Sequence, residues 1–167
     1  WGAVVCQVPL LDMKRYNRLL AGASWMAEYG NPDIDTDWNF LQKYSAYHNI
    51  SSNIKESIHP PLLMTTSTRD DRVHPYHARS FIKRLIDINL SRESLREHQI
   101  LDLSNLTNSN SNKDKNKDKN NYLNSGVNEE LYYYENIEGG HGGAADNKQA
   151  ASMHALVYDF LWKVLQR

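Results

Sequence analysis

The clearest indication of the fold class is the run Leu62-Leu63-Met64-Thr65-Thr66-Ser67, with the charged turn Arg69-Asp70-Asp71-Arg72 that follows it. The stretch starts after Pro60-Pro61, and its apolar residues run on without alternation, which is typical of a strand buried on both faces of a parallel sheet. From about Tyr76 to Ile88 the apolar spacing becomes helical. We therefore predict a strand, a loop and a helix in this order.

The same order recurs near the end of the chain. The residues from Leu131 to Asn136 are β-rich, Gly139-Gly140-His141-Gly142-Gly143 is a glycine-rich turn, and Asp146 to Gln166 carries the apolar stripe of a long amphipathic helix. At the other end, the Val-rich run from Trp1 to Pro9 predicts a further buried strand. Repeated units of this kind predict the α/β class, with a mostly parallel sheet flanked by helices.

The segment between the first two strands predicts smaller helical pieces. From Leu11 to Glu28 the apolar residues have near-helical spacing, until the run from Tyr29 to Asp33 breaks the pattern. We expect a loop with short helical turns there. Asp35 to Tyr47 then predicts one helix with its apolar residues on one face.

Residues 104–130 have a different composition, dominated by Asn, Ser, Lys and Asp. Such a segment buries too little apolar surface to offset the entropy lost on ordering, which predicts a disordered surface insertion. A nucleic-acid-binding arm is the alternative. Against it, Asp interleaves with Lys in the repeat from Asn112 to Asn120, and this repeat holds no aromatic residue on which a base could stack.

The bulk composition limits the classes of function. With 167 residues, 40% of them apolar, the chain has enough material for one domain. A formal charge of −1 creates no global field that favours nucleic acid or a membrane surface. The longest apolar runs are also shorter than the roughly 20 residues that a membrane helix needs.

The cysteine content and the first residue bear on the compartment. Cys6 is the single cysteine, and its apolar context fits a buried thiol in a reducing compartment, so we expect a cytoplasmic protein. The chain opens at Trp1 without an initiator Met. We therefore expect the true amino terminus upstream, and a secretory signal there stays an open alternative.

An acid pair and a histidine follow two of the predicted strands. Functional groups of open α/β sheets collect on loops at the carboxyl ends of strands, which is where Asp70, Asp71 and His141 stand. A histidine can take a proton from a serine hydroxyl and return it to a leaving amine, while a carboxylate fixes the imidazole tautomer and stabilises the imidazolium. In α/β-hydrolases the nucleophile comes first, then the acid, then the histidine, and the last two occur here in that order.

These loops resemble those of the prolyl oligopeptidase family of serine peptidases. The stretch from Leu62 to Pro75 is similar to the family's acid loop, and Gly139-Gly140-His141-Gly142 is similar to its histidine loop. Four further stretches fit the family in the same order: Gly2 to Pro9, Gly22-Ala23-Ser24-Trp25, Glu28-Tyr29-Gly30 and Tyr44-Ser45. The resemblance implies that residues 1–167 are the C-terminal part of an α/β-hydrolase peptidase domain, incomplete and without the family's N-terminal β-propeller.

The resemblance implies an activity and its catalytic residues. The substrates would be short proline-containing peptides, hydrolysed after proline through an acyl-enzyme. Asp70 is implied as the carboxylate of the Ser-Asp-His triad and His141 as its base. Asp71 is implied as a neighbour that hydrogen-bonds the loop.

Substrate-binding residues are implied in the same way. Arg72 corresponds to an arginine that binds a substrate carbonyl, and an ion pair with Asp71 is the alternative. Trp25 is similar in position to an indole that stacks on the proline ring before the scissile bond, and plain core packing is the alternative. Val73 and Ala21 are implied as lining of the same pocket.

A metal site is a further possibility that the spacing of His74 and His77 raises. A zinc site needs a third protein ligand in reach, and Pro75 interrupts the helical turn that would present both rings. We therefore expect no metal and no cofactor.

The nucleophile is the missing part. No Gly-x-Ser-x-Gly elbow occurs in the sequence, and the serines nearest to glycine are Ser24 and Ser125. The resemblance implies that the serine and the propeller precede Trp1, so we expect the chain to be inactive alone. Two alternatives stay open: a non-catalytic remnant or half of a split protein that needs a partner chain, and an oligopeptidase or esterase of another specificity.

Overall fold

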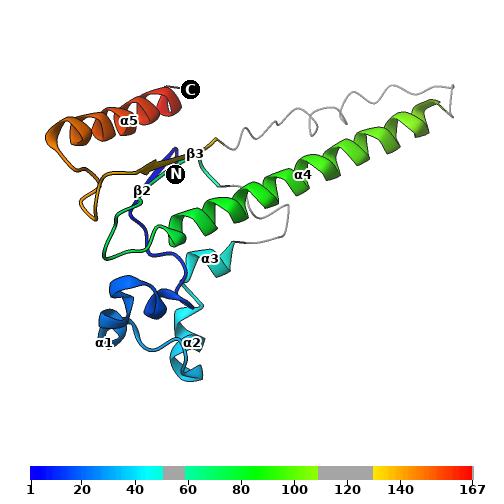
Figure 1. Cartoon of the computed structure of the whole chain (residues 1–167). Coiled ribbons are helices and arrows are strands. Elements are labelled where there is room, and N and C mark those ends of the chain that lie inside the picture. The colour runs from blue at the N-terminus through cyan, green and yellow to red at the C-terminus, as the bar shows by residue number, and fades with distance from the viewer. Residues whose placement is uncertain (51–58, 109–129, 167) are drawn as a thin grey trace.

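The computed structural model describes residues 1–50, 59–108 and 130–166. In this part of the chain three parallel strands form a sheet in the order β1-β2-β3, with β1 at Val4–Gln7, β2 at Leu62–Ser67 and β3 at Leu131–Asn136. Figure 1 shows helix α5, Asn147–Leu165, on one side of the sheet and helix α4, Tyr76–Asn108, on the other. The parallel sheet and its flanking helices, predicted from the sequence, are confirmed.

Strand β2 is buried on both faces, as its continuous apolar run predicts. Leu62 and Met64 belong to one core cluster with Ile82 of α4, whereas Leu63 packs with Phe160 of α5. The split follows from the strand's period of two, which sends successive side chains to opposite faces. The middle strand is therefore held by a helix on each side.

Strand β1 is shorter and less buried than the predicted run from Trp1 to Pro9. Three of its side chains are partly buried and Gln7 is exposed, because within the described residues β1 pairs with β2 alone. The strand ends at Gln7, and the next residue, Val8, has a φ of 41° in the left-handed region that β-branched residues rarely adopt. Pro9 follows and has no N–H to continue the ladder.

The connection from β1 to β2 contains a helical segment, defined here as residues 10–50. It begins with the predicted short turns: η1 at Tyr16–Arg18, η2 at Leu20–Trp25 and α1 at Met26–Tyr29. The single helix predicted from Asp35 to Tyr47 is wrong, because two helices occur, α2 at Asp35–Leu41 and α3 at Ala46–Asn49.

Ser45 accounts for the break between α2 and α3. Its Oγ accepts a hydrogen bond from the N–H of Met13 at 3.0 Å, and it also lies 3.3 Å from the carbonyl oxygen of Leu11. These long-range bonds hold Ser45 in an extended conformation before the next helix starts.

Helix α4 continues well beyond the predicted end at Ile88. The stretch from Tyr76 to Asn108 contains neither Gly nor Pro, so nothing in it breaks the helix. The helix includes residues 104–108, for which disorder was predicted, and that part of the prediction is wrong. The rest of the predicted insertion, residues 109–129, lies outside the described residues.

Helix α5 matches its prediction closely. It starts after Asp146, whose side chain accepts the N–H of Gln149 at 2.8 Å and so caps a free donor of the first turn. In the described part of the chain, none of the helices has the length and apolar character needed to span a bilayer.

Candidate active site

Asp70 lies in the turn that follows β2. Its side chain is fully buried, and Oδ1 accepts the N–H groups of Arg72 and Val73, each at 2.9 Å. Two such bonds close the turn around the carboxylate. Hydrogen bonds within the turn itself therefore help to orient the Asp70 carboxylate.

The loop that carries His141 begins where β3 ends. The side chain of Asn136 spans the base of this loop: its Oδ1 accepts the N–H groups of Glu138 and Gly139, and its Nδ2 donates to the carbonyl oxygen of Gly143 at 2.6 Å. Gly139 is required by close approach, since a Cβ there would lie 2.4 Å from the carbonyl oxygen of Gly143. Gly143 itself has φ +82°, which favours glycine.

The two loops bring His141 and Asp70 together. Nδ1 of His141 lies 3.0 Å from Oδ2 and 3.1 Å from Oδ1 of Asp70. Because an ionised carboxylate can only accept, Nδ1 carries the proton and Nε2 keeps a free lone pair. His141 is one-third exposed, so Nε2 can act as a base toward a hydroxyl brought to it.

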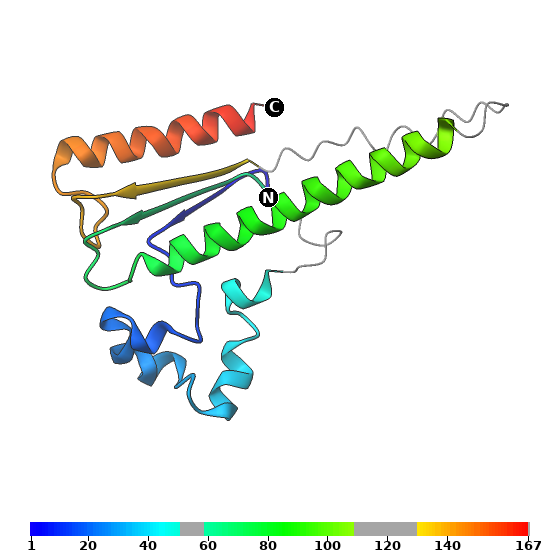
Figure 2. The ribbon, with the colours of Figure 1, turned by 45° about the vertical axis from the view of Figure 1, so that its right-hand side comes forward.

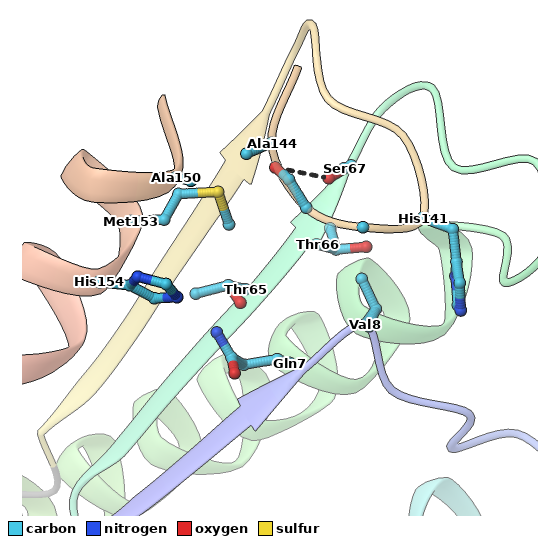
Figure 3. A pocket seen from close by; sticks show the side chains of 12 residues that line it. Gln7, Val8, Thr65, Thr66, Ser67, His141, Ala144, Ala150, Met153 and His154 are labelled. Atoms are coloured by element: carbon cyan, nitrogen blue, oxygen red, sulfur yellow. Dashed lines mark hydrogen bonds between the residues drawn. The ribbon is translucent and has the colours of Figure 1, made fainter. Parts of the chain in front are cut away.

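A cavity of about 160 Å³ lies beside His141 at the carboxyl ends of β1 and β2 (Figure 3). Figure 3 shows His141 at one rim of the cavity and His154, from α5, on the opposite wall. The remaining lining comes from the two strand ends, the histidine loop and α5: Gln7, Val8, Thr65, Thr66, Ser67, Gly142, Gly143, Ala144, Ala150 and Met153.

A cluster around Glu135 fixes the strand ends under the acid loop. Arg79 of α4 pairs with Glu135 of β3, and Thr68 donates to Glu135 at 2.6 Å. The hydrogen bonds from Arg79 lower the pKa of Glu135 to about 2, so this carboxylate is ionised at neutral pH. Since Thr68 precedes Asp70 by two residues, the cluster anchors the start of the acid loop.

Asp71 does not have the loop-bonding role expected for it. Its side chain is exposed, and both N–H groups of the turn donate to Asp70 instead. That expectation is therefore wrong. Arg72 is exposed as well, and within the described residues it forms no ion pair with Asp71.

The other expected site residues fall in two places. Val73 is buried in the acid loop, where its N–H donates to Asp70. Ala21 and Trp25 belong to η2 in the helical segment, and Trp25 packs against the cluster of Met13, Tyr16 and Leu41. Figure 2 shows this part of the helical segment on the side of the molecule where the strands end.

His74 and His77 each use Nδ1 for a backbone N–H. Nδ1 of His74 accepts from Tyr76 at 3.0 Å, and Nδ1 of His77 accepts from Asp12 at 3.2 Å. Among the described residues no group of three His, Cys, Asp or Glu side chains is placed to hold a metal ion.

A buried polar cluster around Asp12 was not predicted from the sequence. This carboxylate is fully buried, accepts from Arg15, and lies near His48, whose Nε2 is 3.9 Å away. His48 in turn contacts Ser45 Oγ at 2.7 Å. One feature of the sequence could have predicted this cluster. Asp12 stands in the apolar run Leu10-Leu11-Asp12-Met13, where an unpaired carboxylate is rare.

Ser45, His48 and Asp12 form a chain of residue types like a triad, but the geometry does not suit nucleophilic attack. Ser45 is fully buried, and its Oγ is held by the N–H of Met13. The ring is also reversed, because Nδ1 faces the serine and Nε2 faces the acid, at 3.9 Å. The cluster therefore organises the helical segment.

Comparison with known proteins gives matches over the whole chain. The profile of the prolyl oligopeptidase family, Peptidase_S9, matches residues 1–167. An uncharacterized peptidase of Sinorhizobium fredii is 36% identical over 99% of this chain, and the chain spans 17% of that protein. The dual function macrocyclase-peptidase of Amanita bisporigera is 36% identical over 51% of this chain, which corresponds to 11% of that protein.

Two kinds of solved structure match over 99% of the chain. The post-proline cleaving enzyme from Rickettsia typhi is 31% identical, with a TM-score of 0.70, and 18% of its chain is covered. A structure from a study of two prolyl endopeptidases is 32% identical, with a TM-score of 0.64, and 19% of its chain is covered. The 167 residues thus span less than a fifth of the relatives they match.

Proposed function

The chain belongs to the prolyl oligopeptidase family, and we propose that it supplies the acid and the base of a serine peptidase that cleaves short peptides after proline. The observation that carries the proposal is the contact of His141 Nδ1 with the buried Asp70 carboxylate. It leaves Nε2 free for proton transfer, as a serine mechanism requires. The nucleophile would come from polypeptide outside these 167 residues, together with the family's β-propeller.

The proposed reaction has two halves. The serine Oγ attacks the carbonyl carbon of proline while Nε2 of His141 takes the hydroxyl proton, and Asp70 stabilises the imidazolium that forms. His141 then gives this proton to the leaving amine, and the acyl-enzyme remains. In the second half a water molecule loses a proton to His141 and attacks the ester carbonyl; the ester bond to the serine breaks, His141 returns the proton to the serine Oγ, and the peptide acid is released.

The substrate would be held by residues from both loops and from the helical segment. Trp25 would stack on the proline ring, because a flat indole matches that ring by shape and apolar contact. Val73 and Ala21 would line the same pocket. Arg72 would donate to a substrate carbonyl, which its exposed guanidinium is free to reach.

The first test uses the purified chain. Because no Gly-x-Ser-x-Gly elbow is present, a fluorophosphonate probe should not label it. Loss of the nucleophile alone costs on the order of 10⁶ in rate. Labelling of the chain by this probe would refute the inactivity that we propose for it.

The second test uses a completed enzyme, defined here as the Rickettsia typhi enzyme with its matched part replaced by this chain. We expect cleavage of a chromogenic peptide with proline before the scissile bond, and little cleavage when alanine replaces proline. Hydrolysis of simple esters without peptide cleavage would favour an esterase. A folded completed enzyme without any hydrolysis would favour a non-catalytic role.

A further inference from the structure

The buried carboxylate of Asp12 is not part of the proposed catalytic pair, yet both of its oxygens accept hydrogen bonds. Its Oδ1 accepts the N–H groups of Lys14 at 3.0 Å and Arg15 at 3.2 Å, and its Oδ2 accepts Arg15 Nη1 at 2.8 Å. These bonds fold residues 12–15 into a tight turn. A buried charge is tolerated there because each oxygen has a partner.

The turn is fastened to the amino end of α4. The N–H of Asp12 donates to Nδ1 of His77 at 3.2 Å. Arg15 Nη1 lies 2.8 Å from the hydroxyl of Tyr76, and the guanidinium lies over the Tyr76 ring at 5.8 Å. Tyr76 and His77 are the first residues of α4 and follow closely on Val73 of the acid loop.

The same turn leads directly into the aromatic part of the helical segment. Tyr16 is fully buried and donates its hydroxyl to the carbonyl oxygen of Gly30. With Met13 and Leu41 it forms the cluster against which Trp25 packs. The contact between Asp12 and His77 is therefore a junction between the segment that carries Trp25 and the loop that carries Asp70.

The protonation state of the His77 ring allows it to accept the hydrogen bond from the N–H of Asp12. Its side chain is buried, and burial lowers its pKa to about 4. The ring is consequently neutral near pH 7, and its Nδ1 lone pair is available to the N–H of Asp12. Without that acceptor the N–H would be buried and unpaired, which is costly.

We propose that Asp12 and His77 are positioning residues for substrate selectivity: their hydrogen bond sets where Trp25 stands relative to Asp70 and His141. This role in selectivity rests on the proposed function. Neither residue would touch the substrate. Their effect would be to keep a proline bound at Trp25 in line with the base and acid.

The test compares two variants of His77 in the completed enzyme. His77→Asn keeps an acceptor, because its amide oxygen can take the place of Nδ1, whereas His77→Leu removes it. We expect H77L to lower the preference for proline over alanine, measured as a ratio of kcat/KM values, by about tenfold, mainly through a higher KM for the proline peptide. H77N should stay within about twofold of the parent.

A second readout separates positioning from general loss of structure. The rate of fluorophosphonate labelling depends on the serine and the pair Asp70 and His141 but needs no proline, so it should be unchanged in H77L. An unaltered proline preference in H77L would overturn the proposal. A parallel fall of labelling and preference would overturn it as well, because His77 would then support the whole domain.

Amide hydrogen exchange keeps the inference testable if the proposed function fails. A parent completed enzyme without proline preference would refute that function alone. Exchange in residues 12–30 should still be faster in H77L than in H77N, because the junction is broken only in H77L. Equal exchange in the two variants would overturn the junction itself.

Discussion

Nδ1 of His141 contacts both carboxylate oxygens of Asp70, at 3.0 and 3.1 Å, although the two residues stand on loops after different strands. The parallel order β1-β2-β3 explains how this occurs, because the carboxyl ends of β2 and β3 lie side by side. The buried carboxylate turns the imidazole so that Nε2 is the free nitrogen. The catalytic predictions below all depend on this contact.

The first prediction concerns the acid pair. Asp70→Asn in the completed enzyme should lower kcat on the order of 10⁴-fold, because an amide donor facing Nδ1 favours the wrong tautomer of His141. Asp71→Asn is the matched control, since Asp71 is exposed. Its kcat should change by less than about twofold. Steady-state kinetics on a proline peptide would decide, and a larger loss in D71N than in D70N would contradict the assignment.

The second prediction concerns Trp25. Trp25→Ala should lower kcat/KM for peptides with proline by roughly 10- to 200-fold and leave the alanine peptide almost unaffected, because the lost contact is specific to the ring. Trp25→Phe should retain part of the preference. Trp162→Ala is the control, as Trp162 of α5 is 68% exposed. An equal loss on both peptides would show that Trp25 serves only the cluster of Met13, Tyr16 and Leu41.

The third prediction concerns the glycines beside His141. Gly139→Ala should strongly reduce fluorophosphonate labelling of the completed enzyme, because its Cβ would lie 2.4 Å from the carbonyl oxygen of Gly143 and displace the loop. Gly142→Ala is the matched control, since a Cβ there meets nothing within 4 Å. Labelling rates of the two variants make the comparison. If G139A labels as fast as G142A, the loop does not depend on this close approach.

The fold was predictable where the signal is local. β2 was predictable from its continuous apolar run, because α4 and α5 bury both of its faces. α5 was predictable from the apolar stripe along one face and from the N-cap residue Asp146. β1 was predicted too buried, since the burial of a strand depends on neighbours that its own residues do not reveal. The end of α4 was missed because the helical apolar spacing was followed only to Ile88, and composition suggested disorder from residue 104 onward.

The site was predictable where its residues directly follow predicted strands of the sheet. Asp70 and His141 follow strands, so their loops could be placed at one edge of the sheet. The roles within the acid pair could not be separated, because only the backbone geometry shows that Asp70 accepts both N–H groups of the turn. The contact of Asp12 with His77 joins positions 65 apart and follows no periodicity.

The fourth prediction concerns pH and follows from His77. Its pKa falls from 6.5 to about 4 in the folded chain, because burial disfavours the charged ring. Between these values the unfolded chain binds more protons at this residue, so the free energy of unfolding rises with pH. The contribution is fully present above about pH 6.5 and is lost as the pH falls toward 4. The loss amounts to about 3 kcal/mol.

The comparison of the 167-residue chain with its H77N variant isolates this contribution. Asn does not titrate, and its amide oxygen can still accept the N–H of Asp12. His48, whose pKa burial also lowers, is present in both proteins and cancels in the difference. Urea unfolding at pH 7 and at pH 4 should show that the parent loses more stability than H77N. If the parent and H77N differ in free energy of unfolding by the same amount at both pH values, His77 is not held neutral by its burial beside Asp12, His74 and Tyr76.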